Sequence, residues 1–254
     1  MSGLIFHVPH ASTAFPPGER ERLILKDHEL ADELLRLTDA ATDRLFLAAM
    51  GEGDLAVVFP WSRLLVDVER FRDPEQEPMA ARGMGAVYEL TSRGRRLRPE
   101  GFDPEPLLRE FYDRHHRELA AATTRMLADH GRAVIIDCHS FPSRPLPCDL
   151  DQNPERPQIC LGTDPSHTPA WLVQSLEEVF TRRGLRCARN APYAGTMVPL
   201  EYLGRDRRVL SVMIELRRDL YMDELSGELG GIDGISLLLQ QAIANMADQM
   251  HCVG

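Results

Sequence analysis

Two histidines in this chain stand just after apolar runs, and a glutamate ends a third run. The three segments are Leu4-Ile5-Phe6-His7-Val8-Pro9-His10-Ala11-Ser12, Ala133-Val134-Ile135-Ile136-Asp137-Cys138-His139-Ser140 and Val209-Leu210-Ser211-Val212-Met213-Ile214-Glu215. In open α/β sheets the carboxyl ends of the strands border the crevice in which ligands bind. We therefore expect two imidazoles and one carboxylate to meet there, in a metal site with a general base.

The expected metal ligands are His10, His139 and one aspartate. Zinc in a hydrolytic site takes three protein ligands from His, Asp and Glu and leaves one position for water. The aspartate should come from Leu37–Phe46, where Asp39 and Asp43 would share one face of a helix. We favour Asp39 as the ligand, and Asp43 remains its substitute or a partner that orients a ligand histidine.

Glu215 closes the most apolar of the runs. A carboxylate buried there without a partner would be costly, so it should meet an activated water, an arginine or a backbone donor. In the functional interpretation Glu215 accepts a proton from the water that attacks a carbonyl and delivers it to the leaving nitrogen. The alternative interpretation is a structural ion pair with an arginine.

Three arginines are candidates for binding a substrate carboxylate, because the planar guanidinium donates two parallel hydrogen bonds. They are Arg63, Arg70 and Arg217. Arg63 and Arg70 flank a predicted strand at 64–68, and we favour Arg70 as the substrate clamp. The segment Asn190–Thr196 could form another wall of the pocket, since its glycine allows close backbone approach.

Size and composition restrict the class of protein. A chain of 254 residues with 43% hydrophobic residues can form one domain over 1–254. Its net charge of -10 argues against a nucleic-acid surface. The apolar runs are far shorter than the ~20 residues that cross a membrane, and no signal-like segment begins the chain, so we expect a soluble cytoplasmic protein. The sequence leaves the oligomeric state open.

The five cysteines show no Cys-x-x-Cys spacing, which favours reduced thiols over a disulfide framework. Cys138 stands beside His139, and a nucleophilic thiol is one interpretation of that pair. Adjacent side chains of a strand point to opposite faces, however, so we expect Cys138 to be a small buried residue.

The elements that must position these residues alternate along the chain. Strands are expected at 3–8, 55–59, 64–68, 133–138, 158–162 and 209–215. Helices are expected at 19–36, 38–50, 104–130, 168–183 and 233–250. This alternation is typical of a sheet covered by helices on both faces. Residues 72–103 and 141–157 read as long ordered loops, a kind of segment that often forms a lid or binding loop.

An ordered set of motifs over roughly residues 4–225 resembles the N-formylglutamate amidohydrolase (N-formylglutamate deformylase) family. The motifs are Val8-Pro9-His10-Ala11-Ser12, Leu37-Thr38-Asp39 through Asp43-Arg44-Leu45-Phe46, Ser62 through Arg70, Asp137-Cys138-His139-Ser140, Asn190 to Gly195 and Ile214-Glu215-Leu216-Arg217. The resemblance implies a three-layer α/β/α sandwich with a mixed central sheet, phosphorylase/hydrolase-like and similar to the zinc carboxypeptidases. In those carboxypeptidases a Glu-Leu-Arg at a strand end supplies the general base.

The activity that the resemblance implies is hydrolysis of the formyl amide of N-formyl-L-glutamate, which yields formate and glutamate in histidine breakdown. The implied cofactor is Zn²⁺, and another divalent ion is the alternative. Within the shared motifs we also place Ser140 and Tyr193 at the substrate, and Asp137 behind a metal ligand. The expected partner is a small molecule with a carboxylate.

One residue departs from the family pattern. Members of the family often have Asp-x-Asn-Arg where this chain has Asp67-Val68-Glu69-Arg70. An acid facing the pocket would oppose a dianionic substrate, which leaves another N-acyl amino acid or a carboxypeptidase-like substrate as an alternative. Pairing of Arg70 with Glu69 or Asp67 that leaves no free guanidinium in the pocket would favour that alternative. A non-catalytic binding protein of the same fold would require that His10, His139 and Glu215 do not converge.

Overall fold

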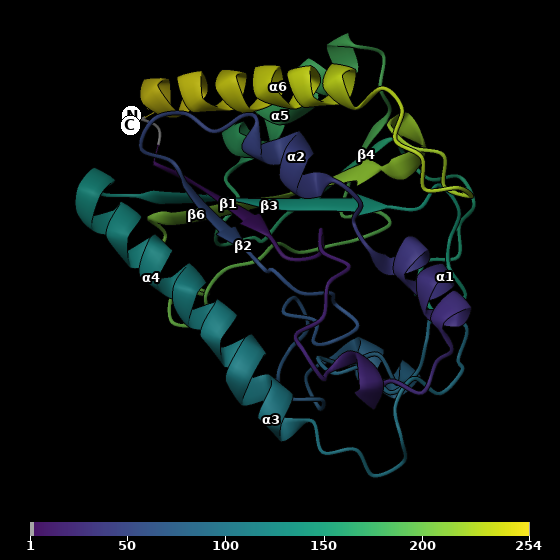
Figure 1. The fold of residues 1–254 in the computed structure, drawn as a ribbon. Coiled ribbons are helices and arrows are strands. Elements are labelled where there is room, and N and C mark those ends of the chain that lie inside the picture. Colours follow the sequence, from purple (N-terminus) through teal and green to yellow (C-terminus); the bar gives the residue numbers. More distant parts are fainter. Residues whose placement is uncertain (1–2, 254) are drawn as a thin grey trace.

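The fold is built on a six-stranded sheet, seen in a computed structural model that describes residues 3–253 (Figure 1). The strands are β1 (Leu4–Val8), β2 (Leu55–Val58), β3 (Ala133–Phe141), β4 (Ile159–Gly162), β5 (Cys187–Arg189) and β6 (Val209–Arg217). Their order across the sheet is β2-β1-β3-β6-β4-β5. β2, β1, β3 and β6 run parallel, while β4 is antiparallel to β6 and pairs with β5. The sheet is therefore mixed.

Helices cover both faces of this sheet, which confirms the predicted α/β class (Figure 1). The α-helices are α1 (Asp27–Leu37), α2 (Thr42–Leu47), α3 (Glu105–Leu107), α4 (Asp113–His130), α5 (Ala170–Arg182) and α6 (Ile232–Val253). Shorter helical turns are Arg20–Arg22, Pro78–Arg82 and Arg218–Leu220, and a π-helical turn, Leu108–Tyr112, joins α3 to α4. In Figure 1, α2, α5 and α6 lie on one face of the sheet and α4 lies on the other.

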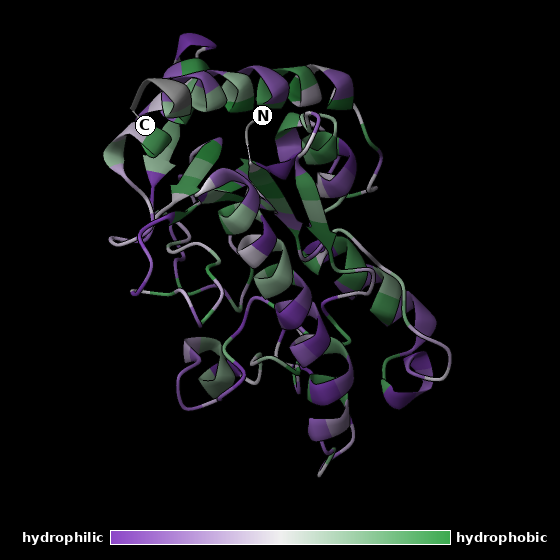
Figure 2. Ribbon diagram, turned by 90° about the vertical axis from the view of Figure 1, so that its left-hand side faces the viewer, coloured by the Kyte–Doolittle hydropathy of each residue, from purple (hydrophilic) through white to green (hydrophobic). Residues whose placement is uncertain are grey.

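The two faces carry separate apolar cores because alternate strand residues point in opposite directions. On one face, residues such as Phe6, Ile136 and Ile214 pack with α2, α5 and α6. On the other face, Ile5 and Ile135 pack with α4. The central strands are predominantly green in the hydropathy colouring of Figure 2. Parallel strands buried on both faces explain the nearly unbroken apolar runs in the sequence.

Some of the helices and strands predicted from the sequence are wrong. The predicted strand at 64–68 is a buried loop that begins with a turn, in which Leu65 N–H donates to Ser62 O at 2.9 Å. The predicted helix at 38–50 is shortened to α2, because Thr38 ends α1 and Ala41 adopts a left-handed conformation before α2 begins. The short strand β5 was not predicted, because a segment of three residues with charged or polar flanks has little β propensity.

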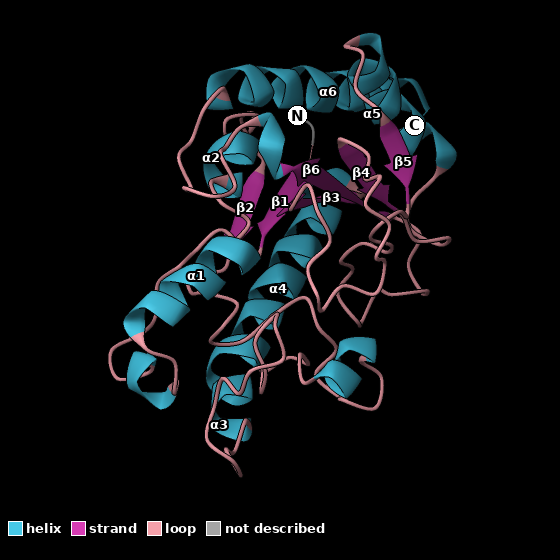
Figure 3. Cartoon of the chain, turned by 90° about the vertical axis from the view of Figure 1, so that its right-hand side faces the viewer, coloured by secondary structure: helices cyan, strands magenta, loops and turns pink. Residues whose placement is uncertain are grey.

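The long loop at 72–103 is ordered by a buried arginine. Arg98 is 1% exposed and donates hydrogen bonds to the carbonyl oxygens of Leu64, Leu65 and Tyr88. The Arg98 side chain thereby connects the loop at 72–103 to the segment at 64–68, which was predicted to be a strand. The irregular segments lie mainly beyond one edge of the layered core, as Figure 3 shows in pink.

A close backbone approach at the end of β4 gives the first testable prediction. A Cβ at Gly162 would lie 2.1 Å from Gly195 O and 2.9 Å from Met213 Cβ, so the backbone would have to move. We expect Gly162→Ala to lower the free energy of unfolding by about 3 kcal/mol, measured by urea denaturation.

The matched control is Gly234→Ala in α6, where a Cβ meets nothing within 4 Å. We expect this change to raise stability by about 0.5–1 kcal/mol. A Gly162→Ala protein as stable as the wild type would show that the contact between β4 and the 190–196 segment is not tight.

Candidate functional site

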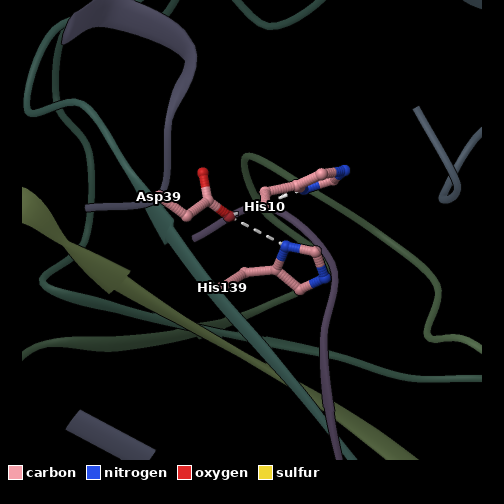
Figure 4. A group of neighbouring side chains, drawn as sticks. All are labelled: His10, Asp39 and His139. Atoms are coloured by element: carbon pink, nitrogen blue, oxygen red, sulfur yellow. Dashed lines mark hydrogen bonds and ion pairs between the residues drawn. The ribbon is translucent and has the colours of Figure 1, made fainter. Parts of the chain in front are cut away.

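His10, Asp39 and His139 converge at the carboxyl ends of β1 and β3 (Figure 4). The Asp39 Oδ2 atom lies 3.1 Å from His139 Nδ1 and 3.6 Å from His10 Nδ1. A backbone hydrogen bond of 3.0 Å from Asp39 N–H to His10 O joins the two loops that carry them. One potential ligand atom from each residue lies within 4.8 Å of the other two, which is the spacing that a single metal ion requires.

The outer nitrogen of each histidine meets a buried aspartate. His10 Nε2 lies 2.7 Å from Asp67 Oδ1, and His139 Nε2 lies 3.1 Å from Asp137 Oδ1. Such carboxylates hold metal-binding imidazoles in one tautomer and leave Nδ1 free to bind. His10 Nδ1 is in fact buried without a hydrogen-bond partner among residues 3–253. The donor set and its supporting carboxylates therefore fit a divalent metal ion such as Zn²⁺.

Asp39 is held by charge as well as by the histidines. Its Oδ1 accepts a hydrogen bond from Arg218 Nη2 at 3.1 Å, and its Oδ2 accepts one from Ser140 N–H at 3.3 Å. Burial alone would raise the pKa of Asp39, but the neighbouring imidazoles of His10 and His139 lower it below the usual range. Asp39 is therefore an anion at neutral pH.

Glu215 stands beside this group. It is directly opposite His139 in the β3–β6 register and is 7% exposed. Its Oε2 atom is buried and accepts no hydrogen bond within the described part of the chain. Burial raises the pKa of Glu215 to about 8, and the nearby His139 counteracts only part of that shift. A carboxyl with a pKa near neutrality can both accept and return a proton.

A cavity of about 510 Å³ joins these groups to the long loops. Among the residues that line it are His10, Asp39, His139, Glu215, Arg63, Arg70, Ser140 and Tyr193. Three other predicted site residues, Asp43, Asp137 and Arg217, do not line it. The Arg217 guanidinium instead donates to Asp219 and to Arg156 O, while its neighbour Arg218 lines the cavity. Asp43 lies on α2, so it does not share a helix face with Asp39, which precedes that helix.

The two arginines of the 62–70 motif differ in their partners. Arg63 donates to Asp67 Oδ2 at 2.7 Å and also to Tyr88 Oη and Leu37 O. Arg70 has only longer ion-pair contacts, with Asp67 at 3.6 Å and Glu77 at 3.7 Å. No ion pair joins the side chains of Arg70 and Glu69 among the described residues, and the Arg70 side chain is 28% exposed and lines the cavity.

A second buried group lies behind the first. His7 Nδ1 is 2.9 Å from Asp137 Oδ1 and 3.1 Å from Glu69 Oε1, and His7 Nε2 is 2.8 Å from His115 Nε2. Burial alone would lower the pKa of His7, but the two carboxylates raise it to about 9. Burial lowers the pKa of His115 well below its usual value. Neutral His115 therefore accepts a hydrogen bond from the Nε2–H group of His7.

This pairing changes the interpretation of the departure at position 69. The charge of Glu69 is balanced by the imidazolium of His7, which lies in strand β1. His7 could not be predicted as a site residue, because it stands inside an apolar run and has no polar neighbour. The roles of Asp67 and Arg218 could not be predicted either, since only the folded chain brings them to His10 and Asp39.

Cys138 points away from the site. It is buried, and its thiol donates to Ile136 O. Burial raises the pKa of Cys138 well above its usual value, which excludes a reactive thiolate at neutral pH. The expectation of a buried structural thiol therefore agrees with the strand geometry.

A cavity with these groups at the carboxyl edge of an α/β sheet is typical of a hydrolytic enzyme. The model of the N-formylglutamate amidohydrolase family matches residues 2–222, and the chain belongs to that family. It is accordingly an amidohydrolase, an enzyme acting on linear amides.

Similar proteins agree with this assignment. The N-formylglutamate deformylase of Pseudomonas aeruginosa is 29% identical over 230 residues, covering 87% of this chain and 82% of the relative. The N-formylglutamate deformylase of Pseudomonas putida is 25% identical over 229 residues, with the same coverage of 87% and 82%. The crystal structure of N-formylglutamate amidohydrolase from Ralstonia eutropha JMP134 superposes with a TM-score of 0.84 at 21% identity, covering 99% of this chain and 95% of that chain. This structural match confirms the fold.

The first prediction from the site concerns the third metal ligand. We expect Asp39→Asn to lose most of the metal that co-purifies with the wild type, because a neutral amide is a poor ligand and also releases Arg218. Asp43→Asn is the matched control and should keep the wild-type metal content, measured by elemental analysis. Metal loss in the control but not in Asp39→Asn would show that Asp43 is the ligand.

The second prediction concerns the pH dependence of stability. The folded-state pKa of His7, about 9, lies above the unfolded value of 6.5, so its contribution is complete below pH 6.5. That contribution disappears as the pH rises through 9, and it amounts to about 3 kcal/mol. We expect the stability difference between wild type and His7→Gln to shrink over this interval in urea denaturation.

The matched control is His28→Gln, since His28 is exposed on α1. We expect its stability to stay within about 0.5 kcal/mol of that of the wild type. A difference between wild type and His7→Gln that stays constant from pH 6.5 to 9 would contradict a charged His7.

Proposed function

We propose that this enzyme hydrolyses the formyl amide of an N-formyl amino acid such as N-formyl-L-glutamate, with a divalent metal ion at His10, Asp39 and His139. The observation that carries the proposal is the buried carboxylate of Glu215, which has an unpartnered Oε2 and lies opposite His139 in the sheet. A purely structural carboxylate in this position would be expected to accept a hydrogen bond.

The residues of the chain have separate tasks in the proposed reaction. A divalent ion, when bound, supplies Lewis-acid polarisation of the carbonyl and a lowered pKa for water. Glu215 removes the proton from the attacking water and then donates it to the nitrogen of the breaking amide bond. Formate and the free amino acid are released. The raised pKa of Glu215 suits both halves of this transfer.

Arg70 is the proposed partner of the substrate carboxylate. It lines the cavity, its side chain is 28% exposed, and its nearest carboxylates lie beyond normal hydrogen-bond distance. Ser140 and Tyr193 also line the cavity and would bound the substrate on the β3 side. The Tyr193 hydroxyl is already held by Asp149 and Arg156, which fixes this part of the wall.

The alternative of a non-catalytic binding protein is disfavoured by the convergence of the site. The rings of His10 and His139 have centroids 5.2 Å apart, and Glu215 occupies the adjacent strand position. A carboxypeptidase-like or other deacylase reaction would use the same groups. Tests with N-formyl, N-acetyl and dipeptide substrates separate these reactions.

The central prediction here is the effect of Glu215→Gln. An amide cannot accept the proton, so we expect kcat/KM to fall by about 10²–10⁴ while metal content stays unchanged. The assay is release of the free amino acid from N-formyl amino acids by the metal-loaded enzyme. Glu201→Gln, an exposed change outside the cavity, is the control and should leave the rate unaltered. Full activity of Glu215→Gln would rule out the proton transfer proposed for Glu215.

A further inference from the structure

The cavity offers fewer free carboxylate-binding groups than its number of arginines suggests. Four guanidinium side chains line it, those of Arg36, Arg63, Arg70 and Arg218. Arg218 is 3% exposed and donates to Asp39, to Ser140 and to Arg36 O. Arg63 donates hydrogen bonds to Asp67, Tyr88 and Leu37 O, as described above. The guanidinium groups of Arg218 and Arg63 therefore already have hydrogen-bond partners within the protein.

The remaining two arginines differ in position and contacts. Arg36 bonds to Asp32 on its own helix at 3.3 Å and lies 3.7 Å from Glu33. Arg70 makes no hydrogen bond through its side chain within residues 3–253, and its two ion pairs are long, from Nε to Asp67 at 3.6 Å and from Nη1 to Glu77 at 3.7 Å. Arg70 is thus the cavity guanidinium that is free to form a bidentate contact with one carboxylate.

The rest of the cavity is unsuited to a second carboxylate. Carboxylates of the protein, those of Glu69, Asp149 and Asp151, also line it. Glu69 pairs with His7 and Asp149 pairs with Arg156, so these two cations already balance acids of the protein. Like charges brought together at a site oppose binding.

Both long loops instead contribute an apolar wall. Its members are Pro78, Met79, Met84, Leu146, Cys148 and Leu150. Met79, Met84 and Cys148 belong to a buried apolar cluster against which Leu146 packs, which makes the wall rigid. Leu150 is 62% exposed despite its size, so it offers apolar surface that the protein does not cover itself.

The free guanidinium and the apolar wall are neighbours. Arg70 lies 3.7 Å from Glu77, and the other Glu77 contacts include the backbone N–H of Met79 at 2.9 Å. Glu77 also directly precedes Pro78, the first residue of the wall. The α-carboxylate and the side chain of an amino acid are attached to the same α-carbon and lie close together. One amino acid can therefore place its carboxylate on Arg70 and an apolar side chain on the wall.

We propose that the preferred substrate is an N-formyl amino acid with an apolar side chain. Its α-carboxylate binds Arg70, and its side chain contacts the wall formed by Pro78–Met84 and Leu146–Leu150. The inference rests on the proposed function for the reaction at the metal group and adds the class of amino acid. Leu150 and Leu146 become residues that determine specificity.

The test compares N-formyl-L-leucine with N-formyl-L-glutamate on the metal-loaded enzyme. We expect kcat/KM for the leucine compound to be higher by about tenfold or more, because burying an apolar group in a fitted site gives discrimination of that size. Equal values, or a preference for the glutamate compound, would overturn the inference while leaving the proposed reaction intact.

A pair of variants locates the discrimination. Leu150→Arg introduces a guanidinium at the wall and should shift the ratio of the two kcat/KM values toward N-formyl-L-glutamate by about tenfold. Leu200→Arg is the matched control, because Leu200 is 61% exposed and lies outside the cavity lining. An unchanged ratio in Leu150→Arg, or an equal shift in Leu200→Arg, would contradict the placement of the side chain.

Binding without turnover separates this inference from the proposed function. Calorimetric titration of the metal-loaded Glu215→Gln variant with each intact compound measures affinity independently of hydrolysis. Tighter binding of N-formyl-L-leucine by a wild-type enzyme that hydrolyses neither compound would support the inference and contradict the proposed reaction. Tighter binding of N-formyl-L-glutamate, equal affinities or no binding would each overturn the inference.

Discussion

The structure of this site depends on the need to balance buried carboxylates. Asp39, Asp67 and Asp137 are each almost fully buried at the carboxyl edge of the sheet. An unpaired charge in that position would cost several kcal/mol. Each aspartate therefore contacts a histidine, and Asp39 and Asp67 also contact an arginine. The resulting network orients the imidazoles of His10 and His139 so that their Nδ1 atoms face Asp39.

Glu215 differs from these three aspartates in a way that matters for chemistry. It shares their burial, but its Oε2 receives no hydrogen bond from any described residue. The surroundings therefore lower the pKa of the three aspartates, whereas burial raises the pKa of Glu215. Pairs of acids with opposite pKa shifts are a common arrangement in acid–base catalysis, because one group stays ionised while the other exchanges a proton.

Much of the site could be predicted because parallel strands place their carboxyl ends together. His10, His139 and Glu215 stand at or just beyond the ends of apolar runs, and the register of β3 and β6 brings the last two side by side. The alternation of predicted strands and helices also indicated the layered α/β fold correctly.

Other features depend on tertiary contacts that no local pattern carries. The run at 64–68 has the composition of a strand but is held as a loop by Arg98, which is distant in sequence. Arg217 and Arg218 are adjacent, and the short helical turn after β6 brings Arg218 rather than Arg217 to Asp39. Similarly, His7 pairs with Glu69 only because β1 and the loop after β2 meet at the site.

The central claim is that His10, Asp39 and His139 hold a divalent metal ion, and crystals of the purified protein test it most directly. Anomalous scattering above the absorption edge of the co-purifying metal should give a peak at about 2.0–2.2 Å from His10 Nδ1, Asp39 Oδ2 and His139 Nδ1. A peak only elsewhere in the protein, or crystals of active enzyme with no peak at these three residues, would contradict the account.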